Sequence, residues 1–129
     1  MKKKLIALIL AACLLCLAGC GEHASRYFAV GFVHSNEAKL ARMDFYSFEG
    51  RMVFRLKSDG EGDIQYDANL ESGSATVYYE CHGTRSELFS LKDGETIDAR
   101  GGYVEAGTVY VFVETDGKCT NGSFRFSLE

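Results

Sequence analysis

The 129-residue chain contains no proline and no tryptophan, and it has only three histidines. Without proline, a stiff extended stalk is not expected. The sequence also has no tandem repeats and no low-complexity tracts, so it gives no sign of a disordered tail. The missing tryptophan removes the largest side chain with which proteins stack on sugars. These absences favour one ordinary globular domain over a fibrous or multi-part protein.

Recognisable catalytic and metal-binding motifs are absent as well. His23, His34 and His82 do not form an H-E-x-x-H motif, and no paired C-x-x-C spacing follows residue 20. There is no G-x-S-x-G elbow to expose a nucleophilic serine. No pair stands out among the 18 acidic residues as a glycosidase pair would. We therefore expect a non-catalytic protein without a cofactor, and a small surface hydrolase is the less favoured alternative.

The N-terminus is built like an export signal. Lys2, Lys3 and Lys4 form a positive segment, and the apolar stretch at 5–17 is shorter than the roughly 20 residues needed to cross a bilayer. We expect a signal peptide at 1–19. An uncleaved membrane helix is the alternative, and the small residues just before Cys20 argue against it.

The run Leu17-Ala18-Gly19-Cys20 resembles the lipobox of bacterial lipoproteins. The resemblance implies cleavage before Cys20 and a diacylglycerol on its thiol, and hence attachment to the extracytoplasmic face of the cell membrane. We expect a short tether at 20–26 and a folded domain at 27–129.

Processing would change the charge and the cysteine count. The formal net charge of -4 becomes about -7 once three lysines leave with the signal. Such an acidic chain is repelled by nucleic acid and by anionic headgroups, so we expect no nucleic-acid partner and membrane contact through acyl chains. Cys81 and Cys119 would be the remaining thiols, and outside the cytoplasm they are expected to form a disulfide. Two buried free thiols are the alternative.

Beyond the tether, apolar and polar residues alternate with a period of two, which indicates short antiparallel strands. The alternation runs through 51–57, 64–70, 75–81 and 124–128, and 109–113 is apolar on both faces like a central strand. The predicted turns are Glu49-Gly50, Ser58-Asp59-Gly60, Lys92-Asp93-Gly94, Gly101-Gly102, Thr115-Asp116-Gly117 and Asn121-Gly122. About eight or nine strands predict an all-β domain, an antiparallel β-sandwich or jelly roll.

The stretch at 35–44 fits two structures. Asn36 could cap a short helix, whereas residues 41–45 alternate as in a strand. We expect a loop or a single helical turn, followed by a strand over about 40–48.

Three aromatic residues form a candidate binding patch. Tyr78, Tyr110 and Phe112 lie on the phase opposite to the neighbouring valines, where a half-exposed sheet usually carries polar residues. If exposed, they could bind a glycan or a protein. If the N-terminal segment or the edge of the second sheet covers them, they belong to the core.

Asp59, Glu61 and Asp63 alternate with glycines in an acidic loop of the kind that hard cations such as Ca²⁺ prefer. The EF-hand pattern fails, because Ile64 and Leu70 stand where it needs Gly and Glu. We expect a solvated turn and no bound metal, with these three carboxylates as weak candidates.

The C-terminal half resembles the bacterial pre-peptidase C-terminal domain. The resemblance rests on the residues from Ala75 to Tyr79 that lead into a turn at Gly83, on the stretch from Tyr103 to Val111, and on the closing run from Gly122 to Phe126. It implies a small secreted β-sandwich that accompanies peptidases and has no catalytic residues of its own.

Taken together, the sequence predicts a lipid-anchored binding or interaction module. The alternative within this class is an accessory domain that recognises a carbohydrate or a peptide. The expected partners are the membrane, through the lipid on Cys20, and a protein or glycan ligand.

Overall fold

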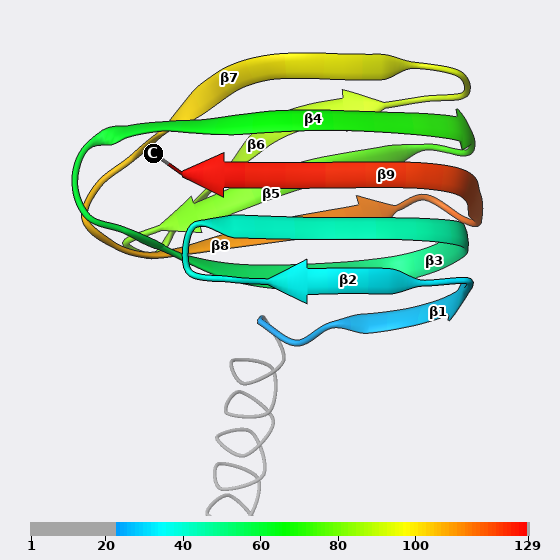
Figure 1. Ribbon diagram of the computed structural model, residues 1–129, viewed down its shortest axis with the longest axis horizontal. Coiled ribbons are helices and arrows are strands. Elements are labelled where there is room, and N and C mark those ends of the chain that lie inside the picture. Colours follow the sequence, from blue (N-terminus) through cyan, green and yellow to red (C-terminus); the bar gives the residue numbers. More distant parts are fainter. Residues whose placement is uncertain (1–22, 129) are drawn as a thin grey trace, which may run out of the picture.

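The computed structural model describes residues 23–128, which form nine antiparallel strands (Figure 1). The strands are β1 (Arg26–Val30), β2 (Val33–Asn36), β3 (Leu40–Ser58), β4 (Gly62–Ser72), β5 (Ala75–Cys81), β6 (Thr84–Leu91), β7 (Thr96–Val104), β8 (Gly107–Thr115) and β9 (Cys119–Leu128). The predicted all-β class is confirmed. The expected signal peptide at 1–19 and the expected lipidation site Cys20 lie outside the described residues. Within 23–128, no helix is long and apolar enough to cross a membrane.

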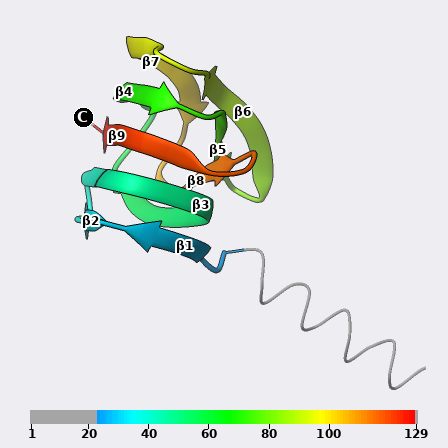
Figure 2. The same cartoon turned by 90° about the vertical axis from the view of Figure 1, so that its right-hand side faces the viewer.

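The 19-residue strand β3 belongs to both layers of the sandwich. Its residues 40–48 pair with β9 and its residues 51–58 pair with β8, while β1 and β2 occupy its other edge. One layer therefore continues from β3 through β9, β4 and β7, and the other through β8, β5 and β6 (Figure 2).

The passage of β3 between the layers changes which of its side chains face inward. Ala41, Met43 and Phe45 are buried in the first half, whereas Phe54 and Leu56 are buried in the second. The predicted turn at Glu49-Gly50 is therefore wrong, because Gly50 is a bend inside one continuous strand. Its φ is +127°, and a Cβ there would lie 2.8 Å from Tyr27 Cα and closer still to the Arg26 carbonyl oxygen. Glycine lets β1 pass this close.

The core lies between the two layers and is rich in phenylalanine. The Phe126 ring of β9 lies 6.1 Å from Phe54 and 6.2 Å from Phe89, both in the opposite layer. Phe89 also stacks on Tyr66 at 4.7 Å. The alternation predicted for 51–57 and 64–70 is confirmed, since the apolar residues of both stretches are buried. Aromatic and aliphatic burial at this scale is the main stabilising contribution in such a domain.

The ambiguous stretch at 35–44 contains no helical turn. Asn36 ends β2, and its side-chain amide donates to Arg55 O at 2.7 Å while its Oδ1 accepts from Arg55 N at 2.9 Å. The asparagine thus acts as an extra rung of the sheet against β3 instead of capping a helix. The strand predicted over about 40–48 is confirmed as the first half of β3.

The predicted disulfide is wrong, because Cys81 and Cys119 are both free thiols. Cys81 ends β5, whereas the Cys119 Sγ donates to Ser74 O at 3.4 Å, just before β5 begins. The length of β5 separates them, about 20 Å at 3.3 Å per residue. A disulfide needs Cα atoms within about 7 Å. The apolar alternation correctly indicates which face of a strand a cysteine lies on. It does not indicate how far apart two cysteines lie along the strands.

We predict that the soluble domain from residue 21 onward has two thiols of very different reactivity toward a thiol reagent. Cys119 is fully buried, and burial raises the pKa of its thiol. Since the thiolate is the reactive form, Cys119 should react with an aromatic disulfide reagent only after denaturation, while the half-buried Cys81 reacts in the native state. Cys81→Ser should remove the native-state reaction. Absence of any thiol in denaturant without reductant would contradict the structure.

Candidate functional site: a cleft at the edges of the two layers

A cleft of about 310 Å³ opens where β6 and β7, the last strands of the two layers, approach one another. Its walls come from β5, from the β5–β6 turn, from β6 and from the end of β7. We call it the edge cleft. Its lining residues are Tyr79, Cys81, His82, Thr84, Ser86, Tyr103 and Glu105.

A bulge in β7 shapes one wall of the edge cleft. Asp63 pairs with Tyr103 and Ile64 with Gly101, so Gly102 is an extra residue in the ladder. Its φ is +72°, and a Cβ there would lie 2.9 Å from the Tyr79 ring. The close approach lets Tyr103 N donate to Tyr79 Oη at 3.1 Å, which joins β7 to β5. The predicted turn at Gly101-Gly102 is therefore wrong.

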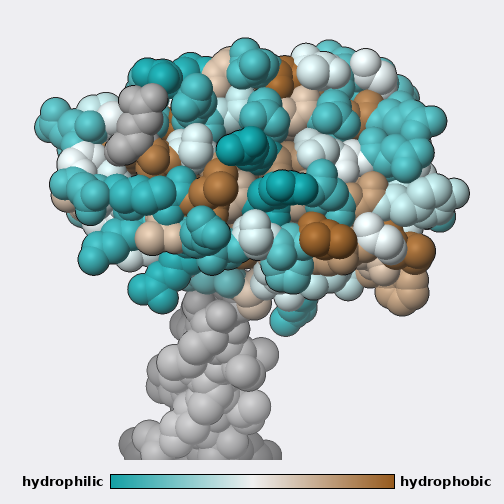
Figure 3. Space-filling model, viewed as in Figure 1, coloured by the Kyte–Doolittle hydropathy of each residue, from teal (hydrophilic) through white to brown (hydrophobic). Residues whose placement is uncertain are grey.

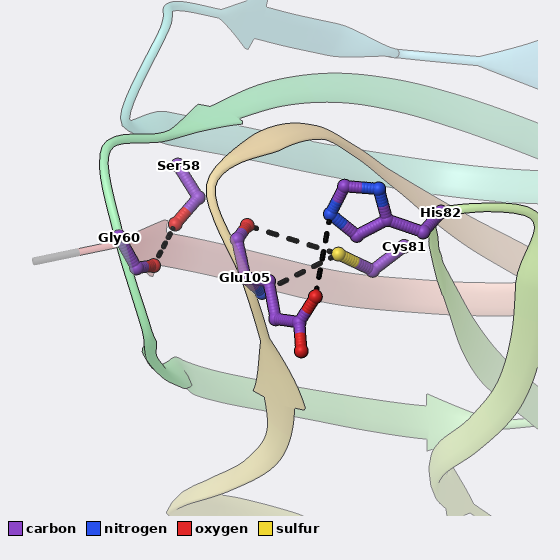
Figure 4. A network of polar contacts seen from close by, with 5 residues as sticks. All are labelled: Ser58, Gly60, Cys81, His82 and Glu105. Carbon is purple, nitrogen blue, oxygen red and sulfur yellow. Dashed lines mark hydrogen bonds and ion pairs between the residues drawn. The ribbon is translucent and has the colours of Figure 1, made fainter.

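Glu105 makes a second connection across the edge cleft. Its backbone N–H donates to Cys81 Sγ at 3.4 Å, and the same thiol donates to Glu105 O at 3.8 Å (Figure 4). These sulfur contacts are weak individually. They nevertheless hold the residue that follows β7 against the end of β5, and so fix where the Glu105 carboxylate lies.

His82 projects from the hairpin turn toward the same carboxylate. His82 and Gly83 have φ values of +52° and +77°, as a two-residue turn of the mirror-image type requires. The imidazole Nε2 lies 3.6 Å from Glu105 Oε2 (Figure 4). Both side chains are more than half exposed, so their ion pair contributes little to stability. The contact between His82 and Glu105 matters because it places the imidazole at the rim of the edge cleft.

Cysteine, histidine and glutamate thus meet at one point without forming a nucleophilic triad. Activation of a thiol requires a base within hydrogen-bond reach of the sulfur. Among residues 23–128, the Cys81 thiol and the His82 imidazole each contact Glu105, and no hydrogen bond joins them to one another. The arrangement therefore supplies polar contacts for a ligand instead of an activated nucleophile.

Of the two tyrosines that line the edge cleft, Tyr103 lies largely open, with 54% of it exposed. Partial desolvation, together with the carboxylates of Glu61 and Glu105, raises the pKa of its hydroxyl. The hydroxyl therefore stays protonated at neutral pH, with carboxylate oxygens beside it as acceptors. An exposed ring flanked by donors and acceptors is suited to a ligand with both an apolar face and many hydroxyls.

No protein-family model matches the sequence. No curated protein is similar to it in sequence either. Among solved structures, the pre-peptidase C-terminal domain of collagenase from Bacillus anthracis aligns at 12% identity and a TM-score of 0.46, over 81% of this chain and 89% of that one. TmCBM61 in complex with β-1,4-galactotriose aligns at 15% identity and a TM-score of 0.45, over 82% and 81%.

A ruminal GH26 endo-β-1,4-mannanase also aligns, at 11% identity and a TM-score of 0.44. The alignment covers 67% of this chain and only 19% of the mannanase. All three TM-scores lie below 0.5, so these likenesses carry no conclusion about this protein. They assign no ligand to it.

The structure brings the three residues of the predicted aromatic patch together but does not leave them open. Phe112 is only 1% exposed. The guanidinium of Arg85 lies 4.7 Å from its ring centroid and 4.2 Å from that of Tyr78. His23 stacks on Tyr110 at 4.0 Å. The N-terminal segment therefore covers part of this face, while Tyr78 and Tyr110 remain half-buried and none of the three residues belongs to the core cluster.

The acidic loop at 59–63 does not gather its carboxylates. Asp59 pairs with Lys39 Nζ at 2.6 Å, and that interaction lowers the pKa of the Asp59 carboxyl. Glu61 lies instead beside the Tyr103 hydroxyl. Within residues 23–128, no cluster of three or more acidic, histidine or cysteine side chains is arranged to hold a metal ion. The contribution of this loop to the site is therefore Glu61, as a neighbour of the edge cleft.

Sequence reasoning did not single out Tyr103, His82 or Glu105 as ligand-binding residues. Tyr103 and Glu105 lie more than 20 positions after Tyr79 and Cys81, and only the approach of β7 to β5 joins them. One signal was present: an aromatic residue directly after Gly101-Gly102, since paired glycines within a strand indicate a bulge that can redirect a side chain.

Proposed function

We propose that this protein is a lipid-anchored binding module of the bacterial cell surface, which holds a neutral glycan in the edge cleft. The observation that carries the proposal is the half-exposed ring of Tyr103, with Glu61 and Glu105 at its hydroxyl and Thr84 and Ser86 on the facing strand. A sugar has an apolar face that stacks on an aromatic ring and a rim of hydroxyls that bond to such groups.

The charges at the edge cleft select among glycans. Glu61 and Glu105 are close to Tyr103 and would repel the carboxylates or sulfates of an anionic polysaccharide. His82 is the only basic residue that lines the cleft. A neutral polysaccharide meets no such repulsion, and its hydroxyls can donate to both carboxylates.

The anchor in this proposal is supported by the run that ends at Cys20 and by the way the described chain begins. His23 stacks on Tyr110, and the Ser25 hydroxyl accepts a hydrogen bond from Val53 N at 2.9 Å. Residues from His23 onward thus contact the folded body, and the proposed tether leads directly into it.

Binding can be tested by affinity electrophoresis of the mature protein in gels that contain soluble neutral polysaccharides. We expect at least one of a panel of galactan, mannan and β-glucan to retard the wild type, and the anionic polysaccharide alginate to leave it unretarded. Tyr103→Ala should weaken the interaction about five-fold, because an aromatic contact is worth roughly 1 kcal/mol.

Tyr46→Ala is the matched control, since Tyr46 is a similarly exposed tyrosine that does not line the edge cleft. It should be retarded like the wild type. A panel that retards nothing, or equal retardation of the wild type and Tyr103→Ala, would refute the glycan proposal. Thermal unfolding of both variants checks that neither loses its fold.

A further inference from the structure

The exposed hydrophobic side chains of the body gather on one side. Among residues 23–128, six large hydrophobic side chains are exposed, and all but Tyr103 lie on β1, β2 or the adjoining part of β3. Phe28 is 80% exposed and Val33 66%. In Figure 3, hydrophobic side chains appear along the lower right margin, where β1 lies in Figure 1. We call the set of Phe28, Val30, Val33 and Tyr46 the apolar edge.

The apolar edge is continuous across the kink between β1 and β2. Gly31 lies against Tyr46, where a Cβ would come within 3.1 Å of the Tyr46 Cβ. This contact places Val30 and Val33, on either side of the kink, next to the tyrosine. Isolated exposed hydrophobic residues are ordinary on protein surfaces, but a contiguous group on an edge strand requires an occupant.

The charge of the body is divided unevenly along the chain. Residues 23–58, which contain β1, β2 and β3, carry six Lys or Arg against three Asp or Glu. Residues 59–128 carry five against thirteen. The whole chain is therefore net negative, but residues 23–58, which include the apolar edge, are net positive. The expected repulsion by anionic headgroups was drawn from the net charge of the whole chain, and this basic segment departs from it.

The proposed attachment point is close to the apolar edge along the chain. If Cys20 carries the lipid, two residues separate it from His23, and such a stretch spans at most about 11 Å whatever its conformation. Phe28 follows His23 by only five residues, at the start of the edge. An anchored body so close to the bilayer must present some surface to it.

We infer that the apolar edge lies on the surface of an anionic phospholipid bilayer, with Phe28, Val30, Val33 and Tyr46 in the headgroup region. The inference rests on the proposed lipid anchor. Tyrosine and phenylalanine suit the interface between headgroups and acyl chains, and exposed Arg26, two positions before Phe28 on β1, supplies attraction to anionic lipid.

This orientation directs the edge cleft away from the membrane. β1 and β2 pair with β3, the middle strand of the order β6-β5-β8-β3-β9-β4-β7, whereas the cleft lies between the two end strands. Figure 1 shows β1 and β7 on opposite margins of the body. A ligand outside the cell would therefore reach the edge cleft while the apolar edge stays in contact with lipid.

Tryptophan fluorescence can test the contact, because the protein has no tryptophan of its own. The lipidated variants Phe28→Trp and Tyr103→Trp are each reconstituted into vesicles of phosphatidylcholine and phosphatidylglycerol that carry brominated acyl chains. We expect quenching by bromine to be several-fold stronger for Phe28→Trp than for Tyr103→Trp. The difference should shrink in purely zwitterionic vesicles, where Arg26 has no anionic partner.

Sedimentation of the same vesicles tests the lipid anchor at Cys20 separately from the contact between the apolar edge and the bilayer. Wild type that pellets, with Cys20→Ser left in the supernatant, supports the anchor. Pelleted protein with equal quenching of both tryptophan variants overturns the bilayer contact alone. Wild type that stays in the supernatant overturns the anchor and the contact together. A blue-shifted Phe28→Trp emission without bromine quenching would place a second copy on the edge and also overturn the inference.

Discussion

Gly50→Ala is expected to lower the free energy of unfolding by about 3 kcal/mol or more, one of the largest effects of any single methyl group in this protein. The new Cβ would lie 2.8 Å from Tyr27 Cα and even closer to the Arg26 carbonyl, and both atoms belong to the backbone of β1. A φ of +127° is also strained for alanine. Relief requires β1 to leave β3 or β3 to straighten, and a straight β3 could not join the two layers.

Chemical denaturation with urea, followed by circular dichroism, would measure this loss. Gly60→Ala is the matched control, because a Cβ at Gly60 meets nothing within 4 Å and its φ is not positive. That variant should be unchanged or slightly more stable, since alanine restricts the unfolded chain. Equal stability of the two variants would show that β1 is not packed against Gly50 as the structure has it.

Gly50 also shows where sequence reasoning about this fold reaches its limit. Ser58-Asp59-Gly60, Lys92-Asp93-Gly94 and Thr115-Asp116-Gly117 were predicted to be turns, and each connects two strands, although Ser58 and Thr115 are themselves the last residues of β3 and β8. Glu49-Gly50, Gly101-Gly102 and Asn121-Gly122 have the same kind of composition but lie inside β3, β7 and β9. Glycine inside a strand marks a bend, a bulge or a close approach of another chain segment. In the sequence, such a glycine looks the same as a glycine in a turn. Only the segment that packs against the glycine in the folded structure distinguishes a turn from a position inside a strand.

The strands themselves were predictable because burial on one face imposes a period of two. Every alternating stretch between 51 and 81 lies in a strand. Distances between strands were not predictable, which is why Cys81 and Cys119 looked suitable for a disulfide. The edge cleft was missed for the same reason, since Tyr79 and Tyr103 meet only because the bulge at Gly102 carries β7 against β5.

Phe126→Ala is expected to cost about 3–5 kcal/mol, the usual range for removing a large buried aromatic side chain. Phe126 is fully buried in β9 and contacts Phe54 and Phe89 across the gap between the layers. Those rings belong to separate strands whose ladders hold them in place, so they cannot move together to fill the space. Stability of a domain this size is typically 5–15 kcal/mol, and the loss would take a large part of it.

Phe28→Ala removes the same side chain from the surface of β1, where 80% of it is exposed. In solution it should change the free energy of unfolding by no more than about 0.5 kcal/mol. Comparing both variants by urea denaturation separates the core between the layers from the apolar edge. Similar losses for the two would mean that the edge packs against the body, which would leave no hydrophobic surface for the bilayer. A negligible loss at Phe126 would instead contradict the packing between the layers, in which this ring lies against both Phe54 and Phe89.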